Sequence, residues 1–219
     1  MKKSYFLVRS LFVSTLVVGV AQASMLLEPY VGENLTLKEK TTYSISGTSL
    51  DVTSKQKAGQ IFGGRLGYSA GLVWVAADYA KSSFKVEDSY SLLSISLASN
   101  TAKVDETRIG LALGVNLPLI RFWGKYLVKV NWDYYNNYLT ATNPGTEFKE
   151  KDSGKGYAVG IGYSLLPLVC LFTEVSQITM NKVDSLTADG LDVSSSVKQT
   201  IERKITNFIV GVSLPINLF

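Results

Sequence analysis

Large apolar side chains alternate with small or polar ones along the stretch RIGLALGVNL, residues 108–117. Successive side chains of a β-strand point to opposite faces of its sheet, so this alternation predicts a strand with two unlike faces. One face carries Ile109, Leu111, Leu113, Val115 and Leu117. The other carries Arg108, Gly110, Ala112, Gly114 and Asn116. A strand of a soluble sandwich would alternate in the same way, so this stretch alone leaves the surroundings of each face open.

The same alternation recurs in eight runs, each near the length that a tilted membrane strand needs. The runs are residues 27–37, 60–68, 72–79, 107–117, 125–135, 156–165, 169–177 and 205–214. Three connections between them are short. The other four, residues 38–59, 80–106, 136–155 and 178–204, are long and polar. Outer-membrane barrels have short periplasmic turns and long extracellular loops, so we predict an all-β fold, an eight-stranded antiparallel up-and-down transmembrane β-barrel.

The two faces of the runs differ in a way that fits lipid on one side and a narrow lumen on the other. The apolar face carries aromatic side chains that we assign to two girdles. These are Tyr68, Tyr126 and Tyr163 toward the short turns, and Tyr79, Trp132, Tyr134, Tyr157 and Phe208 toward the long loops. The lumen face carries Arg65, Asp78, Arg108, Lys125, Lys129, Asp133 and Glu174. Because a lone buried charge is strongly disfavoured, we expect these seven side chains to form a mixed-charge network that closes the lumen.

The first 23 residues have the features of a secretory signal peptide. Lys2, Lys3 and Arg9 precede an apolar run, and AQA at residues 21–23 supplies the small residues that signal peptidase requires. A membrane-anchor helix is the alternative, but the run is short for a bilayer. We therefore expect a cleaved signal, residues 1–23, followed by a barrel domain, residues 24–219.

Charge and residue types restrict the function of the mature chain. The signal holds three of the 22 basic residues, which leaves 19 against 18 acidic residues and no basic patch for nucleic acid. The chain has no histidine and a single cysteine, Cys170, which excludes Ser-His-Asp and Cys-His chemistry and imidazole metal ligation. Two carboxylate pairs, Asp105 with Glu106 and Asp133 with Glu174, could serve as acid and base, although such groups more often are solvated or paired. We predict no catalysis, no cofactor and no metal.

Four segments resemble small bacterial outer-membrane proteins of the OmpA/OmpX-type β-barrel class. They are LEPYVG at residues 27–32, GGRLGY at 63–68, GYAVGIGYSL at 156–165 and FIVGVSLPINLF at 208–219. Members of that class usually end in an alternating strand closed by an aromatic residue, whereas Pro215 interrupts the pattern here. The last strand therefore either ends near Leu214 or continues to Phe219.

The resemblance implies a location in the bacterial outer membrane and a non-enzymatic role. We expect a monomeric barrel that displays four long extracellular loops for adhesion, surface structure or envelope integrity. A narrow passive channel for a small apolar or amphiphilic solute is the alternative. The expected partners are outer-membrane lipid, lipopolysaccharide, the barrel-assembly machinery and a surface ligand held by the loops. Charged loop residues could bind lipopolysaccharide phosphates or divalent ions, although such runs more often are only solvated loop surface: Lys38, Glu39, Lys40, Lys149, Glu150, Lys151 and Asp152.

Overall fold

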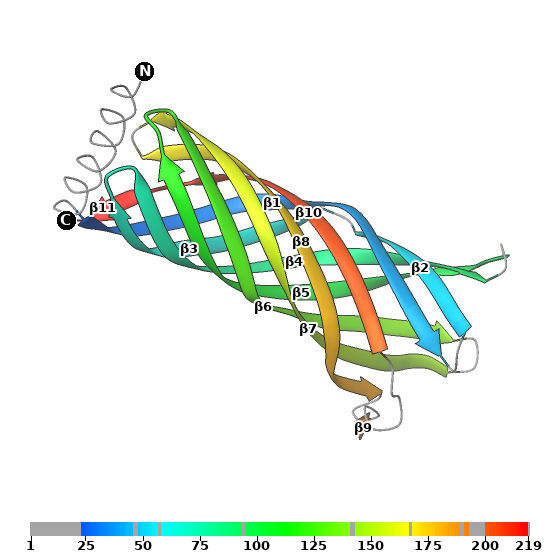
Figure 1. The fold of residues 1–219 in the computed structure, drawn as a ribbon. Coiled ribbons are helices and arrows are strands. Elements are labelled where there is room, and N and C mark those ends of the chain that lie inside the picture. Colours follow the sequence, from blue (N-terminus) through cyan, green and yellow to red (C-terminus); the bar gives the residue numbers. More distant parts are fainter. Residues whose placement is uncertain are drawn as a thin grey trace, which may run out of the picture.

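A computed structural model describes residues 23–45, 48–56, 58–92, 95–140, 143–166, 168–188, 191–192 and 200–218. The expected signal, residues 1–23, lies outside this part of the chain except for Ala23. The strands are β1 (Ala23–Ile45), β2 (Thr48–Gln56), β3 (Gly59–Ala70), β4 (Val73–Leu92), β5 (Ile95–Asn116), β6 (Ile120–Thr140), β7 (Asn143–Leu166), β8 (Val169–Ala188), β9 (Leu191–Asp192), β10 (Thr200–Ser213) and β11 (Ile216–Leu218) (Figure 1). Among these residues, no helix is long and apolar enough to cross a membrane.

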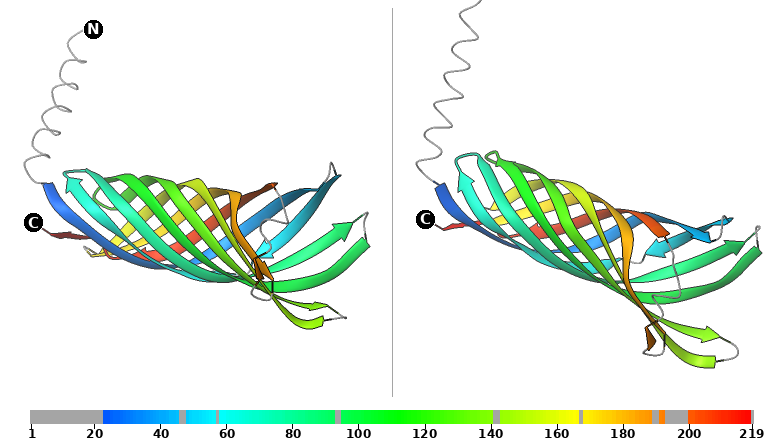
Figure 2. Two further views of the ribbon diagram at one scale, coloured as in Figure 1. Left: turned by 90° about the horizontal axis from the view of Figure 1, so that it is seen from below. Right: turned by 60° about the horizontal axis from the view of Figure 1, so that its bottom comes forward.

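The strands close into an antiparallel ring with eight positions. β2 and β3 follow one another at a single position, because each pairs with β1 on one side and β4 on the other. From β4 the ring runs through β5, β6, β7 and β8. β10 then pairs with both β8 and β1, which closes it. The predicted eight-stranded barrel is thus confirmed, and Figures 1 and 2 show it from three sides.

The three short turns lie together at one rim, as predicted. Residues 71–72 join β3 to β4, and Gly71 has a φ of 60°, a left-handed conformation that favours glycine. Residues 117–119 join β5 to β6, and β7 ends at Leu166 only three residues before β8 begins at Val169. At this rim no described residue between strands is charged.

The four long connections are mostly strand, which corrects the expectation of long loops. β4 and β5 pair from Val73 with Val115 to Leu92 with Ile95, and β6 and β7 pair as far as Thr140 with Asn143. Figure 2 shows these extensions projecting from the barrel as separate arms. The prediction failed because it took an apolar outward face as the mark of a strand. Beyond the lipid the outward face meets water, so the alternation continues with polar residues outside and apolar residues inside.

The interior is packed at two levels. Near the short turns, a cluster of aromatic and small side chains surrounds the predicted charges, and it includes Tyr30, Trp74, Trp123 and Phe172. Toward the extensions lies a second, apolar cluster: Phe84, Val86, Val104, Leu127, Val130, Trp132, Ile178, Met180 and Ile205. The upper part of the barrel therefore has a hydrophobic core of its own.

A β-bulge in β6 reverses the orientation of the side chains that follow it. Leu127 pairs with Gly156 and Val130 with Gly154, so Val128 and Lys129 lie opposite the single residue Lys155. The prediction placed Trp132 and Tyr134 in the outer girdle, and both assignments are wrong. Trp132 is fully buried in the upper cluster, and Tyr134 packs against that cluster.

The girdle assignment of Tyr126 is also wrong. Tyr126 pairs directly with Tyr157, and the two ring centroids are 5.3 Å apart. Tyr126 therefore lies with the residues toward the extensions. Strands are staggered around a barrel, so the number of residues from a turn does not measure height.

The outward face of the barrel is apolar between the two rims. In the stretch 108–117, the five large apolar side chains are all exposed, while Arg108, Gly110, Ala112 and Gly114 are buried. The predicted faces of this strand are thus confirmed.

The chain continues as strand beyond the proline near its end. β10 stops at Ser213, and after Leu214 and Pro215 the strand β11 pairs with the first residues of β1, from Met25 to Leu27. The backbone N–H of Leu214 donates to the carbonyl of Pro29 at 3.0 Å. β10 thus ends next to Leu214, as one of the two predicted endings has it, but the chain forms strand again from Ile216 to Leu218, and Phe219 lies outside the described residues.

We expect Leu113→Arg to impair assembly, because a lipid-facing arginine in an outer-membrane barrel costs up to about 2–4 kcal/mol, the cost at the midplane. Leu113 is 60% exposed on the lipid face. The neighbouring Ala112→Ser faces the lumen and should be nearly neutral. Folding yields in lipid vesicles measure both, and equal yields for Leu113→Arg and the wild type would contradict the assigned faces.

Candidate functional site

Five of the seven predicted lumen charges are buried inside the barrel: Arg65, Asp78, Arg108, Lys125 and Glu174. They come from β3, β4, β5, β6 and β8, so no two share a strand. Each stands on the inward side of an alternating strand, and the glycines and alanines beside them leave room for long side chains.

Arg65 is the centre of the cluster. Its Nη1 lies 3.2 Å from Glu28 Oε1, its Nε 3.1 Å from Asp78 Oδ2, and its Nη2 3.4 Å from Glu174 Oε2. Arg65 and Asp78 are direct partners across the β3–β4 hairpin. The guanidinium of Arg65 thus binds three carboxylates from three strands. It can do so because it carries five N–H donors in a planar, forked arrangement.

Lys125 completes the charge balance around Asp78 and Glu174. Its Nζ lies 2.9 Å from Asp78 Oδ2 and 3.1 Å from Glu174 Oε1. Trp123 donates its indole N–H to Glu174 Oε2 at 2.8 Å, and the hydroxyl of Tyr30 donates to Asp78 at 3.2 Å. Each of these two carboxylates therefore has both cationic and neutral donors.

Glu28 and Arg121 belong to the same cluster but were not predicted. Arg121 holds Glu28 through two bonds, Nη1 to Oε1 at 2.8 Å and Nη2 to Oε2 at 3.1 Å, and donates from Nε to Asn116 at 2.8 Å. Arg121 was missed because it lies in the short connection between the predicted runs 107–117 and 125–135. Its spacing of two from Trp123 and four from Lys125 was the signal that could have placed it inward.

Aromatic rings line the guanidinium groups. The Cζ atom of Arg65 lies 4.5 Å from the ring centroid of Trp123 and 5.1 Å from that of Tyr30. Arg121 lies 5.3 Å from the ring of Trp74. Such contacts stabilise a cation where water is excluded.

Two further ion pairs lie toward the extensions. Arg108 Nη2 is 2.8 Å from Glu106 Oε2, and Trp132 donates to Glu106 Oε1 at 2.9 Å. Arg203 Nη1 is 3.2 Å from Asp152 Oδ2. Among the described residues, the buried charges are then five cations and five anions: Arg65, Arg108, Arg121, Lys125 and Arg203 against Glu28, Asp78, Glu106, Asp152 and Glu174.

Lys129 and Asp133 are not in the lumen, which corrects their assignment. The bulge at Val128–Lys129 turns Lys129 outward and reverses the orientation of the following residues. Asp133 lies 3.7 Å from Lys151 Nζ, and both side chains are exposed. The period-two pattern was read straight through a position where the strand contains one extra residue.

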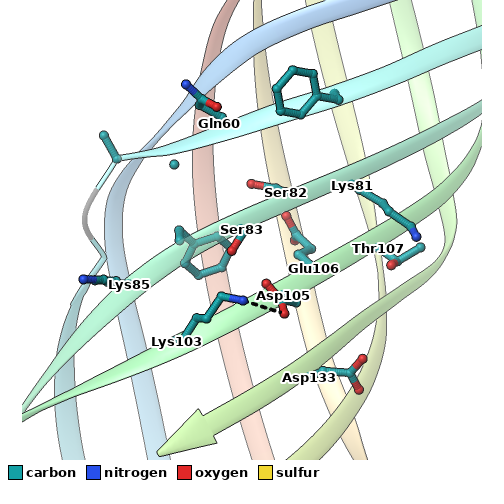
Figure 3. Close-up of a pocket in the computed structure, with 14 residues that line it drawn as sticks. Gln60, Lys81, Ser82, Ser83, Lys85, Lys103, Asp105, Glu106, Thr107 and Asp133 are labelled. Atoms are coloured by element: carbon teal, nitrogen blue, oxygen red, sulfur yellow. Dashed lines mark hydrogen bonds and ion pairs between the residues drawn. The ribbon is translucent and has the colours of Figure 1, made fainter.

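A groove of about 790 Å³ lies on the outside of the barrel over β3, β4, β5 and β6 (Figure 3). Its charged lining residues are Lys81, Lys85, Lys103, Asp105, Glu106 and Asp133. Burial alone would raise the pKa of Asp105, but hydrogen bonds from Ser83 and Lys103 and the charge of Lys103 lower it overall. The groove therefore has mixed charge.

The two carboxylate pairs considered for catalysis are not assembled. Asp105 and Glu106 both line the groove, but they are neighbours on β5 and point to opposite faces: Glu106 is buried and paired with Arg108, whereas Asp105 is partly exposed and paired with Lys103. Asp133 is outside the barrel and Glu174 inside it. Within the described residues, no group of three or more Cys, Asp or Glu side chains could hold a metal ion.

The sequence matches the family described as outer membrane protein beta-barrel domain over residues 10–213. The chain belongs to this family. The match and the fold place the protein in the bacterial outer membrane. A search of curated proteins found no match.

Solved structures with the same fold include several small outer-membrane barrels. OprG from Pseudomonas aeruginosa has a TM-score of 0.55 and 10% identity, over 89% of this chain and 97% of OprG. The outer membrane protease OmpT from Escherichia coli has a TM-score of 0.52 and 12% identity, over 88% and 97%. Ail, the attachment invasion locus protein of Yersinia pestis, was solved with the heparin analogue sucrose octasulfate and has a TM-score of 0.50 and 9% identity, over 88% and 99%. At such identities the likeness shows the fold alone.

We expect Glu174→Gln to lower the free energy of unfolding by about 3–5 kcal/mol, because it leaves buried cations short of an anion. Glu174 contacts Lys125, Arg65 and Trp123. Asp133→Asn removes one carboxylate from an exposed pair and should cost less than about 1 kcal/mol. Urea unfolding in lipid vesicles compares the two, and equal losses would contradict a pairing role for Glu174.

Proposed function

We propose that this protein is a non-enzymatic outer-membrane barrel with a closed lumen that holds rigid β-hairpins at the cell surface. The charge balance of the interior is the main support. Five buried cations and five buried anions fill the interior, and the upper apolar cluster packs around the two pairs that lie toward the extensions, Arg108 with Glu106 and Arg203 with Asp152. A solute would have to break ion pairs and separate packed rings to pass.

The extensions support a role at the surface. β5 and β6 stay paired only as far as Lys103 with Tyr135, and beyond that level the β4–β5 and β6–β7 hairpins stand apart. Paired strands are stiffer than loops of the same length, so the hairpins can hold a contact surface away from the membrane. Ail has the same fold and is an attachment protein by name, which agrees with adhesion as the role. Absence of histidine and the separated carboxylates argue against an enzyme.

The lumen should not conduct ions, because its buried charges are paired and apolar and aromatic side chains pack around them. Planar-bilayer recordings of the purified, folded protein should show little or no stable conductance. The control is the heat-modifiable mobility of a denatured and refolded sample, which shows whether the protein in the bilayer is folded. Large, long-lived channels from the wild-type monomer would instead favour a passive channel for a small apolar or amphiphilic solute.

Shortening the hairpins should reduce adhesion while the barrel still folds. Residues 89–99 and residues 137–147 can each be replaced by Asn-Gly, because the flanking residues Asp88 and Asn100, and Asn136 and Phe148, are cross-strand partners. Adherence of cells to heparin-coated and uncoated surfaces, at equal surface amounts of protein, measures the effect. Unchanged adherence of the shortened variant would contradict a role of the hairpins in attachment.

A further inference from the structure

The outer face of β6 and β7 carries a pair of lysines side by side. The bulge in β6 turns Lys129 outward, and it places Val128 and Lys129 opposite Lys155. Both lysines are exposed. Like charges on facing residues of paired strands repel each other, and an anion bound between these two lysines would relieve the repulsion.

No carboxylate of the described chain lies within ion-pair distance of Lys129 or Lys155. Asp184 is near enough to Lys129 for that charge to contribute to lowering its pKa, but its carboxylate is already bound by Lys182 Nζ at 2.6 Å. With Lys182 and Asp184 included, the patch keeps a net positive charge. An anion bound from outside the described chain would reduce this charge.

Two tyrosines lie directly below the lysines. Tyr126 and Tyr157 are partners on the same two strands, with ring centroids 5.3 Å apart, and both are exposed. Tyr157 is two residues from Lys155 and shares its face. Tyrosines at the edge of the apolar band lie at the level of lipid headgroups, so the lysines are at the level of headgroup phosphates.

A notch in the lipid face lies below the tyrosines, at Gly124. Gly124 points outward, and a Cβ added there would have no atom within 4 Å. Neither a turn nor a close approach of the backbone requires this glycine. Its strand partners are Leu113 and Val159, both large and exposed. The missing side chain leaves an apolar depression of the kind that an acyl chain fills.

We propose that this face binds a phosphorylated glycolipid of the outer leaflet, the lipid A part of lipopolysaccharide. An acyl chain lies in the notch at Gly124, the sugar contacts the rings of Tyr126 and Tyr157, and a phosphate lies between Lys129 and Lys155. The order of apolar, aromatic and cationic groups along the strands matches the order of acyl chain, sugar and phosphate in the lipid. The site deepens the expected contact with lipopolysaccharide, and it is independent of whether the lumen conducts.

The test is the affinity of the folded protein for lipid A in phosphatidylcholine vesicles. Lys129→Gln with Lys155→Gln should weaken binding about tenfold, because a charge-assisted contact to phosphate is worth more than about 1.4 kcal/mol. The double arginine variant should keep the affinity. As a matched control, Lys85→Gln with Lys103→Gln removes an exposed lysine pair from β4 and β5 that already has a carboxylate beside it, Asp105 at 3.1 Å from Lys103 Nζ, and it should have little effect. Inorganic phosphate at millimolar concentration should not displace the lipid.

A second variant and a second lipid separate the parts of the site. Gly124→Leu should weaken binding of lipid A and of its dephosphorylated form alike, because it fills the notch. The double glutamine variant should bind dephosphorylated lipid A as the wild type does. Equal binding of lipid A by the wild type and the double glutamine variant would overturn the proposal. The proposal would also fail if the β4–β5 control variant lost as much affinity for lipid A as the double glutamine variant does. Conductance recordings on the same preparations report on the lumen separately.

Discussion

The structure depends on the need to neutralise charges inside a ring too narrow to hydrate them. An eight-stranded barrel has an interior filled by its own side chains. Arg65 at its centre meets carboxylates from β1, β4 and β8, so a single side chain ties three positions of the ring together. Moving any of these strands by one residue would turn its carboxylate to the lipid side and leave Arg65 short of a partner. The network therefore specifies the register of the barrel as well as closing it.

The face of the strands that carries the apolar side chains changes along the barrel. Between the rims, the outward side chains are apolar because they meet lipid, and the inward ones are polar and paired. In the extensions, Phe84, Val86 and Val104 point inward while Lys85 and Lys103 point outward, as in a water-soluble sheet. One strand thus keeps the same alternation in two environments. Its apolar side chains point outward where it crosses lipid and inward where it lies in water. This allows the hairpins to remain folded beyond the membrane without further domains.

The strands between the rims could be predicted from the sequence because both their faces follow a strict period of two. Arg65, Asp78, Arg108, Lys125 and Glu174 fell on the inward face by that pattern alone. The pattern could not reveal the bulge at Val128–Lys129, since an extra residue changes the phase without changing the composition. For that reason Lys129, Trp132, Tyr134 and Asp133 were assigned to the wrong faces. Pairing partners such as Glu28 for Arg121 depend on stagger around the ring, which is set by all eight positions together.

Arginine and lysine are divided between the two environments of the barrel. All four arginines after residue 23 are buried in the interior, namely Arg65, Arg108, Arg121 and Arg203. Of the lysines with described side chains, only Lys125 is buried, and the others are exposed toward the extensions. A guanidinium is weakly hydrated, binds several carboxylates at once and stacks on aromatic rings, whereas an ammonium is a strongly hydrated point charge. The division follows from this difference: the interior needs cations that can share carboxylates in the absence of water, and the outer surface presents cations that keep their hydration until an anionic group of the membrane replaces it.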